Sequence, residues 1–505
     1  MLERFISWRA IEFKMKIADK YRNEVLVAIV AIIAYAVSVV NGFHTDDWVV
    51  LSLLRDGFSW SDFLSMENPG RFRPLANIFF ALRYAVFHDH AAAYYLVNIA
   101  LHVTFCVLLF RFLKKLGLPV SAALLSALIF GAYFQHYEAV LWLYGTIRIL
   151  GATLWILSLW KLHDYIGDGR RRSFWAFAII SFLGLFVVED LVVAPIGFVI
   201  FALFMAPRES RGRRLGPIAV SGVASLTVYF ALRWLLIARP GITEEYYYPG
   251  LHVITKLWDY LEWMILPPPS HPYFSGFAAR SGSSISFIWN AACVLLTLGL
   301  IGGLLFAFFR SQKTIKFFVI LILLALVPAL PLNYKVGSRN IYIPSIGLAA
   351  VGGYVISKLA SRLGRPGKRI LYGALCAFMA ASIVAIWYTS LEYRRIQTLV
   401  SVMITDLGNS GIDLNQYEYV LLDHMPGRTI VGPAMIYRFN YRHDVIASND
   451  PLAGRIDIKA AARDVYSKGF PFVVFDYRNG HLVEATNQYL ESSRIPETNE
   501  QKPGM

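Results

Sequence analysis

The chain has 505 residues, of which 56% are hydrophobic and only 16% are charged, and its mean hydropathy is +0.50. A soluble protein of this length needs more charge to cover its surface, so the composition excludes an ordinary soluble enzyme. The formal net charge of +14 does not indicate nucleic-acid binding, because the basic residues cluster in short loops between apolar runs. We expect a polytopic all-α membrane protein whose surroundings are the lipid bilayer.

Eleven apolar runs predict about eleven transmembrane helices. The basic segment 1–24 precedes the first run, and no small-residue cleavage pattern follows it, so we expect a retained helix instead of a removed signal peptide. The predicted spans, which together make a transmembrane domain over 25–389, are 25–42, 93–112, 118–135, 139–160, 174–189, 191–206, 217–237, 286–309, 317–332, 342–360 and 370–389.

Lysine and arginine in the short loops indicate the orientation. Alternate loops contain RFLKK, KLHDYIGDGRRR, PRESRGRR, RSQKTIK and SRLGRPGKR, whereas the remaining connections are longer and less basic. Basic short loops face the cytoplasm. The N-terminus is therefore expected inside, and the segments 43–91 and 238–285 are expected to be external loops, the first with one or two amphipathic segments on the membrane.

The pattern changes beyond residue 390. YEYVLLD, RTIVGP and FPFVVFDY predict strands, and IDIKAAARDVYSKG predicts a helix. We expect a small external α/β domain over 390–490. The polar tail 491–505 is expected to be disordered.

Two adjacent carboxylates, Asp46 and Asp47, follow the first predicted span. One interpretation is that Thr45 or Asp46 caps a helix running from Trp48 to Asp56. The other is that a carboxylate at the outer end of a bundle takes the proton of an acceptor hydroxyl. The same loop contains RFRPL, and its arginines are suited to binding a phosphate.

Other charged residues are predicted at the outer ends of spans. Ionisable groups at membrane depth are costly, so Glu138, Glu189 and Asp190 are candidates for a shared site, although carboxylates at helix ends can simply be solvated. Arg339 begins the tenth span, four residues after Lys335. An arginine gains no favourable interaction from the partial positive charge at a helix N-terminus. One explanation for Arg339 is therefore a bound anion, and the other is a side chain that snorkels to the membrane surface.

Metal and cofactor motifs are weak. His88, Asp89 and His90 are adjacent, and no further ligand set is evident, so a metal site there is not favoured. The sequence has no glycine-rich phosphate loop and no nucleophile elbow. We expect no cofactor, with a divalent metal possible but not required.

The order TDDW, FRPL, YYLVNIALH, HYEAVLW, VEDLVVAP and SRNIYIPSIG resembles the membrane half of GT-C glycosyltransferases. The closest likeness is to the protein O-mannosyltransferase-like group, which includes transmembrane mannosyltransferases with tetratricopeptide repeats. The resemblance covers residues 40 to 360. It implies inverting transfer of a sugar from a polyprenyl phosphate to an acceptor hydroxyl on the non-cytoplasmic side.

The resemblance also implies residue roles. Asp46 matches the expected general base and Asp47 its supporting neighbour, while Arg73, Arg339 and Tyr342 match motifs expected to bind the donor phosphate. The positions that match supporting or acceptor-binding motifs are Asn98, His102, His136, Glu138 and Glu189.

This sequence departs from the group's pattern. Tyr95, Val188 and Ser338 replace a histidine, a lysine and a glutamate, Arg148 stands where an aspartate is common, and no tetratricopeptide repeats are present. These changes favour a donor or acceptor different from that of the group. We expect the protein to lie in the bacterial inner membrane and to act in an envelope pathway, with a glycan, a lipid or a protein as the acceptor. Two alternatives are a transporter or flippase of lipid-linked sugars, which predicts inverted repeats and midplane charges, and a non-catalytic scaffold of the same fold.

Overall fold

The computed structural model describes residues 21–43, 45–57, 59, 63–64, 71–237, 250–266, 282–332, 337–426, 431–439, 441, 443–450 and 454–494. The chain packs into two units. The first unit comprises Met1–Val40 and Ser59–Ser390, and the second comprises Asn41–Phe58 and Leu391–Met505. The division falls inside one helix, α18 (Arg365–Asn409), which belongs to both units.

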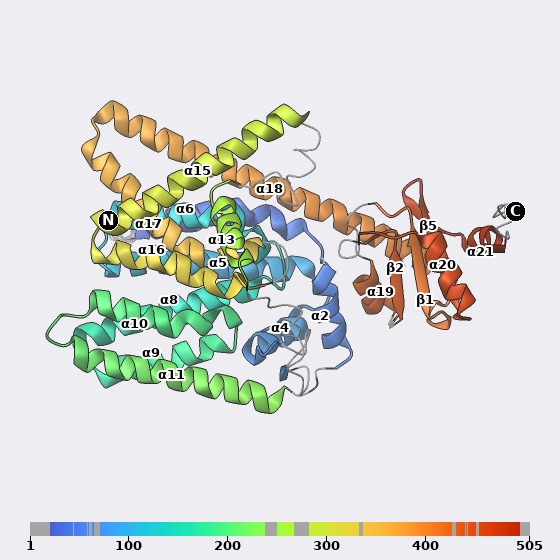
Figure 1. The fold of residues 1–505 in the computed structure, drawn as a ribbon, viewed down its shortest axis with the longest axis horizontal. Helices are drawn as coiled ribbons and strands as arrows, with labels where there is room; N and C mark the ends of the chain where they lie inside the picture. The colour runs from blue at the N-terminus through green and yellow to red at the C-terminus, as the bar shows by residue number, and fades with distance from the viewer. Residues whose placement is uncertain are drawn as a thin grey trace, which may run out of the picture. The chain divides into compact units, whose positions relative to one another are not determined.

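The first unit is helical (Figure 1). It begins with the helical segment Tyr21–Val40, whose last residues form η1 (Ala36–Val40). Its longer elements are α4 (Pro74–Phe87), α5 (Ala91–Lys115), α6 (Val120–Gly131), α8 (Thr146–Asp168), α9 (Arg171–Leu185), α10 (Ala194–Met205), α11 (Arg211–Leu236), α13 (His252–Trp263), α15 (Gly282–Arg310), α16 (Lys313–Leu326) and α17 (Pro344–Arg362). Short elements join them: η2 (Phe134–His136), α7 (Tyr137–Val140), η3 (Glu189–Val193), η4 (Val327–Ala329) and η5 (Ser338–Ile341).

A helix occupies each of the eleven predicted spans, but not every one is long or apolar enough to cross a membrane. Among the described residues five helices meet that requirement, or six if α6 and the η2–α7 segment, bent by 51°, form one broken span. The helices α9, α10 and α16 have only 15, 12 and 14 residues, against about 20 for a full span. The structure therefore supports five or six crossings by length and composition, and the count of eleven is not confirmed.

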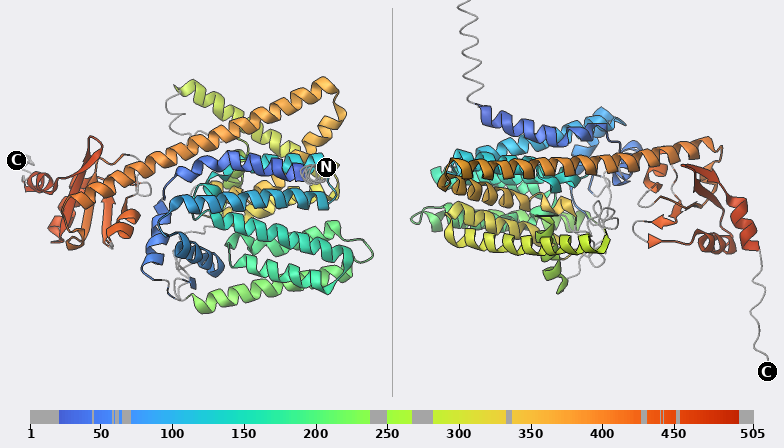
Figure 2. Two further views of the ribbon diagram at one scale, coloured as in Figure 1. Left: turned by 180° about the vertical axis from the view of Figure 1, so that it is seen from behind. Right: turned by 90° about the horizontal axis from the view of Figure 1, so that it is seen from above.

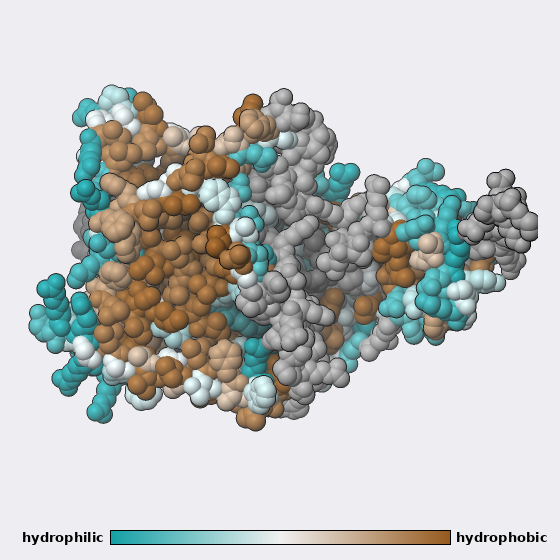
Figure 3. Space-filling model, viewed as in Figure 1, coloured by the Kyte–Doolittle hydropathy of each residue, from teal (hydrophilic) through white to brown (hydrophobic). Residues whose placement is uncertain are grey.

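Exposed apolar side chains cover much of the first unit. Figure 3 shows a broad hydrophobic face over its helices. Phe306 and Phe309 of α15 are 68% and 70% exposed, and Trp234 of α11 is 76% exposed. Contiguous apolar surface of this kind indicates contact with lipid, which confirms that the chain is an integral membrane protein.

The helices α6 and α17 pack antiparallel (Figures 1 and 2). At one end the hydroxyls of Ser121 and Ser357 lie 2.7 Å apart, and at the other His136 Nε2 lies 2.6 Å from Ser345 Oγ. The helices touch closely between these points. A Cβ added at Gly353 would lie 2.5 Å from the backbone nitrogen of Ser126, so only glycine permits this approach.

The second unit is built on a four-stranded sheet with the order β2–β1–β5–β6. Its strands are β1 (Tyr419–Asp423), β2 (Asp444–Ala447), β5 (Phe472–Arg478) and β6 (His481–Glu484). β1 pairs in parallel with β2 and β5, and β6 pairs antiparallel with β5. The remaining elements of this unit are α2 (Thr45–Arg55), η6 (Leu414–Gln416), α19 (Gly432–Phe439), β3 (Asn449–Asp450), β4 (Gly454–Arg455), α20 (Ile458–Ser467) and α21 (Thr486–Arg494).

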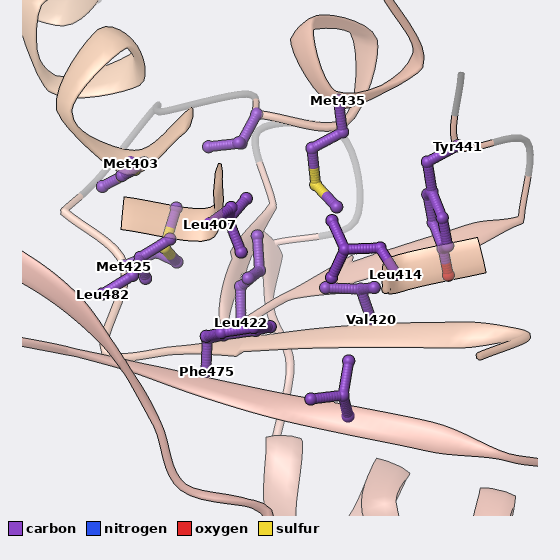
Figure 4. Close-up of a cluster of buried hydrophobic side chains, with 12 residues drawn as sticks. Met403, Leu407, Leu414, Val420, Leu422, Met425, Met435, Tyr441, Phe475 and Leu482 are labelled. Carbon is purple, nitrogen blue, oxygen red and sulfur yellow. The ribbon is translucent and has the colours of Figure 1, made fainter. Parts of the chain in front are cut away.

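Apolar side chains alternate between the two faces of this sheet. Val420 and Leu422 meet the end of α18 and α19 in one cluster (Figure 4). Leu421 and Val474 meet α20 and α21 in a second cluster on the other face. Because both faces are covered by helices, the strands carry almost continuous apolar runs.

Two of the three predicted strands are confirmed as β1 and β5, and the predicted helix is confirmed as α20. The strand predicted over RTIVGP is wrong at its end, where Gly432 begins α19; residues 428–430 lie outside the described residues. A proline next to that glycine suits the first turn of a helix and not a central strand. The predicted tail boundary is also wrong, because α21 continues to Arg494. α2 begins at Thr45, earlier than the predicted start at Trp48.

Candidate functional site

Arg73 and Glu189 form a buried ion pair at one end of the first unit. Arg73 precedes α4, and Pro74 at the first helical position fixes where that helix begins. Its guanidinium pairs with Glu189, which begins η3, and its Nη1 donates to the hydroxyl of Tyr144 at 2.6 Å. The backbone N–H of Leu75 also donates to the carbonyl of Phe186 at 3.1 Å, so the starts of α4 and η3 are joined twice.

A second ion pair lies beside the first. Asp190, the neighbour of Glu189, pairs with Arg148 in the first turn of α8. The Nη2 of Arg148 donates to Asn340 Oδ1 at 3.1 Å, and Asn340 in turn donates to the hydroxyl of Tyr260 on α13 at 2.8 Å. The pair and its hydrogen bonds therefore link the starts of α8 and η3 to η5, which precedes α17, and to α13, the helix within the predicted external loop 238–285.

Arg339 and Glu138 complete this region. The Oε2 of Glu138, on α7, accepts a hydrogen bond from the backbone N–H of Arg339 at 2.8 Å. The Arg339 guanidinium carbon lies 5.1 Å from the centroid of the Trp142 ring, a cation–π arrangement. We call Arg73, Glu189, Arg148, Asp190, Glu138 and Arg339 the acid–arginine cluster.

Two polar atoms at the cluster are buried without a hydrogen-bond partner among the described residues: Glu189 Oε1 and Trp142 Nε1. Tyr144 connects the two residues: its hydroxyl accepts a hydrogen bond from Arg73, the partner of Glu189, and its ring centroid lies 5.6 Å from that of Trp142. A buried polar atom without a partner costs about 1–3 kcal/mol, so these two atoms are candidates to bind a ligand or an ordered water.

The predicted residues of α5 and η2 lie deeper in the helix bundle. Asn98 donates to the carbonyls of Val140 and Trp142 at 3.1 and 3.2 Å, which ties α5 to the break between α7 and α8. His102 Nδ1 lies 2.9 Å from the hydroxyl of Tyr342. Asn98, His102, His136 and Tyr342 are all fully buried. These contacts brace helices against one another, and the ligand-binding roles assigned to these residues stay predictions.

Asp46 and Asp47 lie in α2, in the second unit. Asp47 is fully buried, and the side chain of Asp46 lies outside the described residues, as does Lys335. The other predicted charged residues belong to the first unit. The meeting of Asp46 with Arg73 and Arg339, and the phosphate-binding role of these arginines, therefore stay predictions.

No role was assigned from the sequence to several polar residues of this region. Ser338 Oγ donates to Gln135 Oε1 at 2.7 Å, and Gln135 Nε2 donates to the carbonyl of Trp263 at 2.6 Å. Asn340 and Tyr260 belong to the same network. Uncharged polar residues are common at helix ends, so nothing in the sequence marks these. The pairing of Arg148 had a signal, because an arginine in an apolar stretch needs a nearby carboxylate.

The HDH stretch forms the turn between α4 and α5. His88 has a positive φ of 44°, and His90 Nδ1 lies 3.0 Å from the carbonyl of Phe87. Within the described part of the chain, no group of three or more histidine, cysteine, aspartate or glutamate side chains is arranged to hold a metal ion.

Comparison with known proteins identifies the fold. No protein-family model matches the sequence, and no characterised protein matches it by sequence. The structure is similar to the crystal structure of the Archaeoglobus fulgidus oligosaccharyltransferase tethered to an acceptor peptide containing the NVT sequon, with a TM-score of 0.50 and 12% identity. The match covers 91% of this chain and 69% of the archaeal chain. The likeness shows the GT-C glycosyltransferase fold, and it does not single out the O-mannosyltransferase-like group.

Proposed function

We propose that the protein is a membrane glycosyltransferase that moves a sugar from a polyprenyl-phosphate donor to an acceptor hydroxyl on the non-cytoplasmic face. The observation that supports this most is the acid–arginine cluster, in which three arginines and three carboxylates meet where helices of a GT-C fold begin. Charges gathered at one end of a membrane bundle are costly unless they serve a function.

The proposed reaction is a single displacement with inversion. The acceptor oxygen forms a bond to the anomeric carbon while the bond from that carbon to the phosphate oxygen breaks. The polyprenyl phosphate leaves with the bonding electrons, and Asp46 receives the proton of the acceptor hydroxyl. The phosphate departs as an anion, so it needs cationic donors instead of a general acid.

Arg339 is the proposed contact for the donor phosphate. It lies just before α17, and its side chain is partly exposed, unlike those of the buried Arg73 and Arg148. Those two arginines are held by Glu189 and Asp190 and would orient the site. The buried atoms Glu189 Oε1 and Trp142 Nε1 are an acceptor and a donor that sugar hydroxyls could satisfy.

The test is donor cleavage by the full-length protein in detergent. Polyprenyl-phosphate monosaccharides labelled in the sugar are the probes, solubilised bacterial envelope supplies acceptors, and the release of polyprenyl phosphate is measured. We expect Asp46→Asn to lower the rate at least about 100-fold, because loss of a general base costs about 10²–10⁴-fold. Asp56→Asn, just beyond the same helix, should retain the wild-type rate. EDTA should not change the wild-type rate, because arginines and not a divalent metal ion are proposed to stabilise the leaving phosphate.

Three outcomes would contradict the proposal. Equal rates for Asp46→Asn and the wild type would show that Asp46 is not the general base. Donor lipid that crosses proteoliposome membranes without being cleaved would identify a flippase. No cleavage and no transport by the wild type, with any donor in the panel, would leave a scaffold of the same fold.

A further inference from the structure

A second polar region lies at the other end of α17. A cavity of about 430 Å³ is lined by nine residues, among them Ser121, Tyr354, Ser357, Lys358, Lys368 and Tyr372. It sits where α6 and α18 begin and α17 ends. Ser357 in its lining is 13 residues after Pro344, where α17 begins near the acid–arginine cluster, or roughly 20 Å along the helix at 1.5 Å per residue. We propose that this cavity binds the phosphate headgroup of an anionic membrane lipid.

The chemistry of the lining calls for an anion. Lys358 and Lys368 are its charged members, and the nine lining residues include no aspartate or glutamate. Lys358 Nζ is 5.6 Å from the centroid of the Tyr354 ring. Hydroxyls supply the remaining polar groups, with Ser121 and Ser357 hydrogen-bonded across the gap between α6 and α17. Two ammonium groups with serine and tyrosine hydroxyls match the oxygens of a phosphate.

The helix directions add to this preference. α6 begins at Val120 with no side-chain cap from Pro119, and α18 begins at Arg365. The first N–H groups of a helix have no intrahelical partner and carry a partial positive charge. α17 ends at the cavity, and its carbonyls suit the lysine on its final turns. Two helix N-termini and two lysines therefore favour an anionic ligand and outweigh the partial negative charge at the C-terminus of α17.

The surroundings indicate a lipid instead of a soluble phosphate. Four residues between the lining positions are apolar and exposed, Val120 by 49%, Val355 by 44%, Leu359 by 45% and Ile370 by 73%, and the exposed Arg362, Arg365 and Arg369 also lie between lining positions. A polar cavity on helices that also expose apolar side chains fits a ligand with a charged head and hydrocarbon tails. Basic pockets between membrane helices bind anionic headgroups in this way.

The experiment measures phosphatidylglycerol binding to the delipidated full-length protein in detergent by native mass spectrometry. Lys358→Gln/Lys368→Gln should weaken binding about 20- to 30-fold, because each lysine near a headgroup contributes about a fivefold effect. Lys358→Arg/Lys368→Arg should bind like wild type. Lys313→Gln/Lys316→Gln is the matched control, since it removes the same charge at the start of α16, outside the cavity.

Three results would overturn the proposal. Equal loss in the control double variant would mean that general surface charge holds the lipid. Equal retention of phosphatidylcholine, which is zwitterionic, would show that the net negative charge of the headgroup is not recognised. Displacement of phosphatidylglycerol by inorganic phosphate would show that the cavity binds the free anion and makes no use of the tails. Phosphatidylglycerol retained selectively against both competitors, and lost only in the cavity variant, supports the lipid site.

Discussion

Arg73 and Glu189 lie 116 positions apart in the chain and form a buried pair. Their side chains are 8% and 20% exposed. Two charges withdrawn from water stabilise a fold little by themselves, but one of them left without its partner is strongly destabilising. The pair therefore makes the position of α4 depend on that of η3, and so holds this end of the first unit in one arrangement.

Glu189→Gln should lower the free energy of unfolding in detergent by about 3 kcal/mol, because the buried Arg73 guanidinium loses its carboxylate. This is the lower end of the range for buried pairs, since the Glu189 side chain is 20% exposed. Arg73→Met/Glu189→Leu should recover most of that loss. Glu24→Gln breaks the more exposed pair with Arg111 and should cost less than about 1 kcal/mol. Thermal unfolding of the wild type and the three variants in detergent measures these differences in stability. A loss for Glu189→Gln no greater than for Glu24→Gln would contradict the role of the pair.

Gly353 allows α6 and α17 to pack with almost no side chain between them. A Cβ there would lie 2.7 Å from the carbonyl oxygen of Ala122 as well as 2.5 Å from the nitrogen of Ser126. Backbone atoms cannot rotate away as a side-chain end can, so the helices would have to separate. Because α17 begins next to Arg339 and α6 leads into His136, such a separation reaches the candidate site.

Gly353→Ala should destabilise the protein by about 1–3 kcal/mol through overpacking. The adjacent Gly352 is the control, because a Cβ there meets only Ile129 Cδ1, at 3.9 Å. Gly352→Ala should be neutral or stabilising by about 0.5–1 kcal/mol, as alanine favours the helix. Unfolding in detergent measures both variants. Equal stability of the two would show that the helices are not in close contact at Gly353.

Elements with a strong apolar pattern were predictable from the sequence. The runs in β1 and β5 and the helix of α20 lie where expected, and helices fill the predicted spans. The helices α9, α10 and α16 lie close to the short predicted spans 174–189, 191–206 and 317–332. The 3₁₀ segments η3 and η4 were not predictable, because apolar residues follow Glu189 and Asp190 in η3 and continue through η4, where the backbone leaves the α-helix. The strand assigned to RTIVGP is wrong at its described end, because the prediction gave more weight to the β-branched residues than to the proline and glycine that begin α19.

For the whole molecule, composition was sufficient to predict a helical membrane protein, and the order of six weak motifs was sufficient to predict the GT-C fold. The sequence also marked Glu138, Glu189 and Asp190, which the structure places in one cluster. It could not show that Arg73 is held by Glu189, because ion pairs between distant segments leave no local pattern. Nor could the sequence show that the segment Asn41–Phe58, which contains Asp46, belongs to the second unit together with the C-terminal sheet.

The central claim is that Asp46 and Arg339 act on one donor molecule. The most direct measurement is a cryo-electron microscopy map of the full-length Asp46→Asn protein with a polyprenyl-phosphate sugar bound. We predict the donor phosphate within about 3 Å of the Arg339 guanidinium and the anomeric carbon of the sugar facing residue 46. Donor density that contacts Arg339 but lies far from residue 46, or that avoids the acid–arginine cluster altogether, would contradict the account.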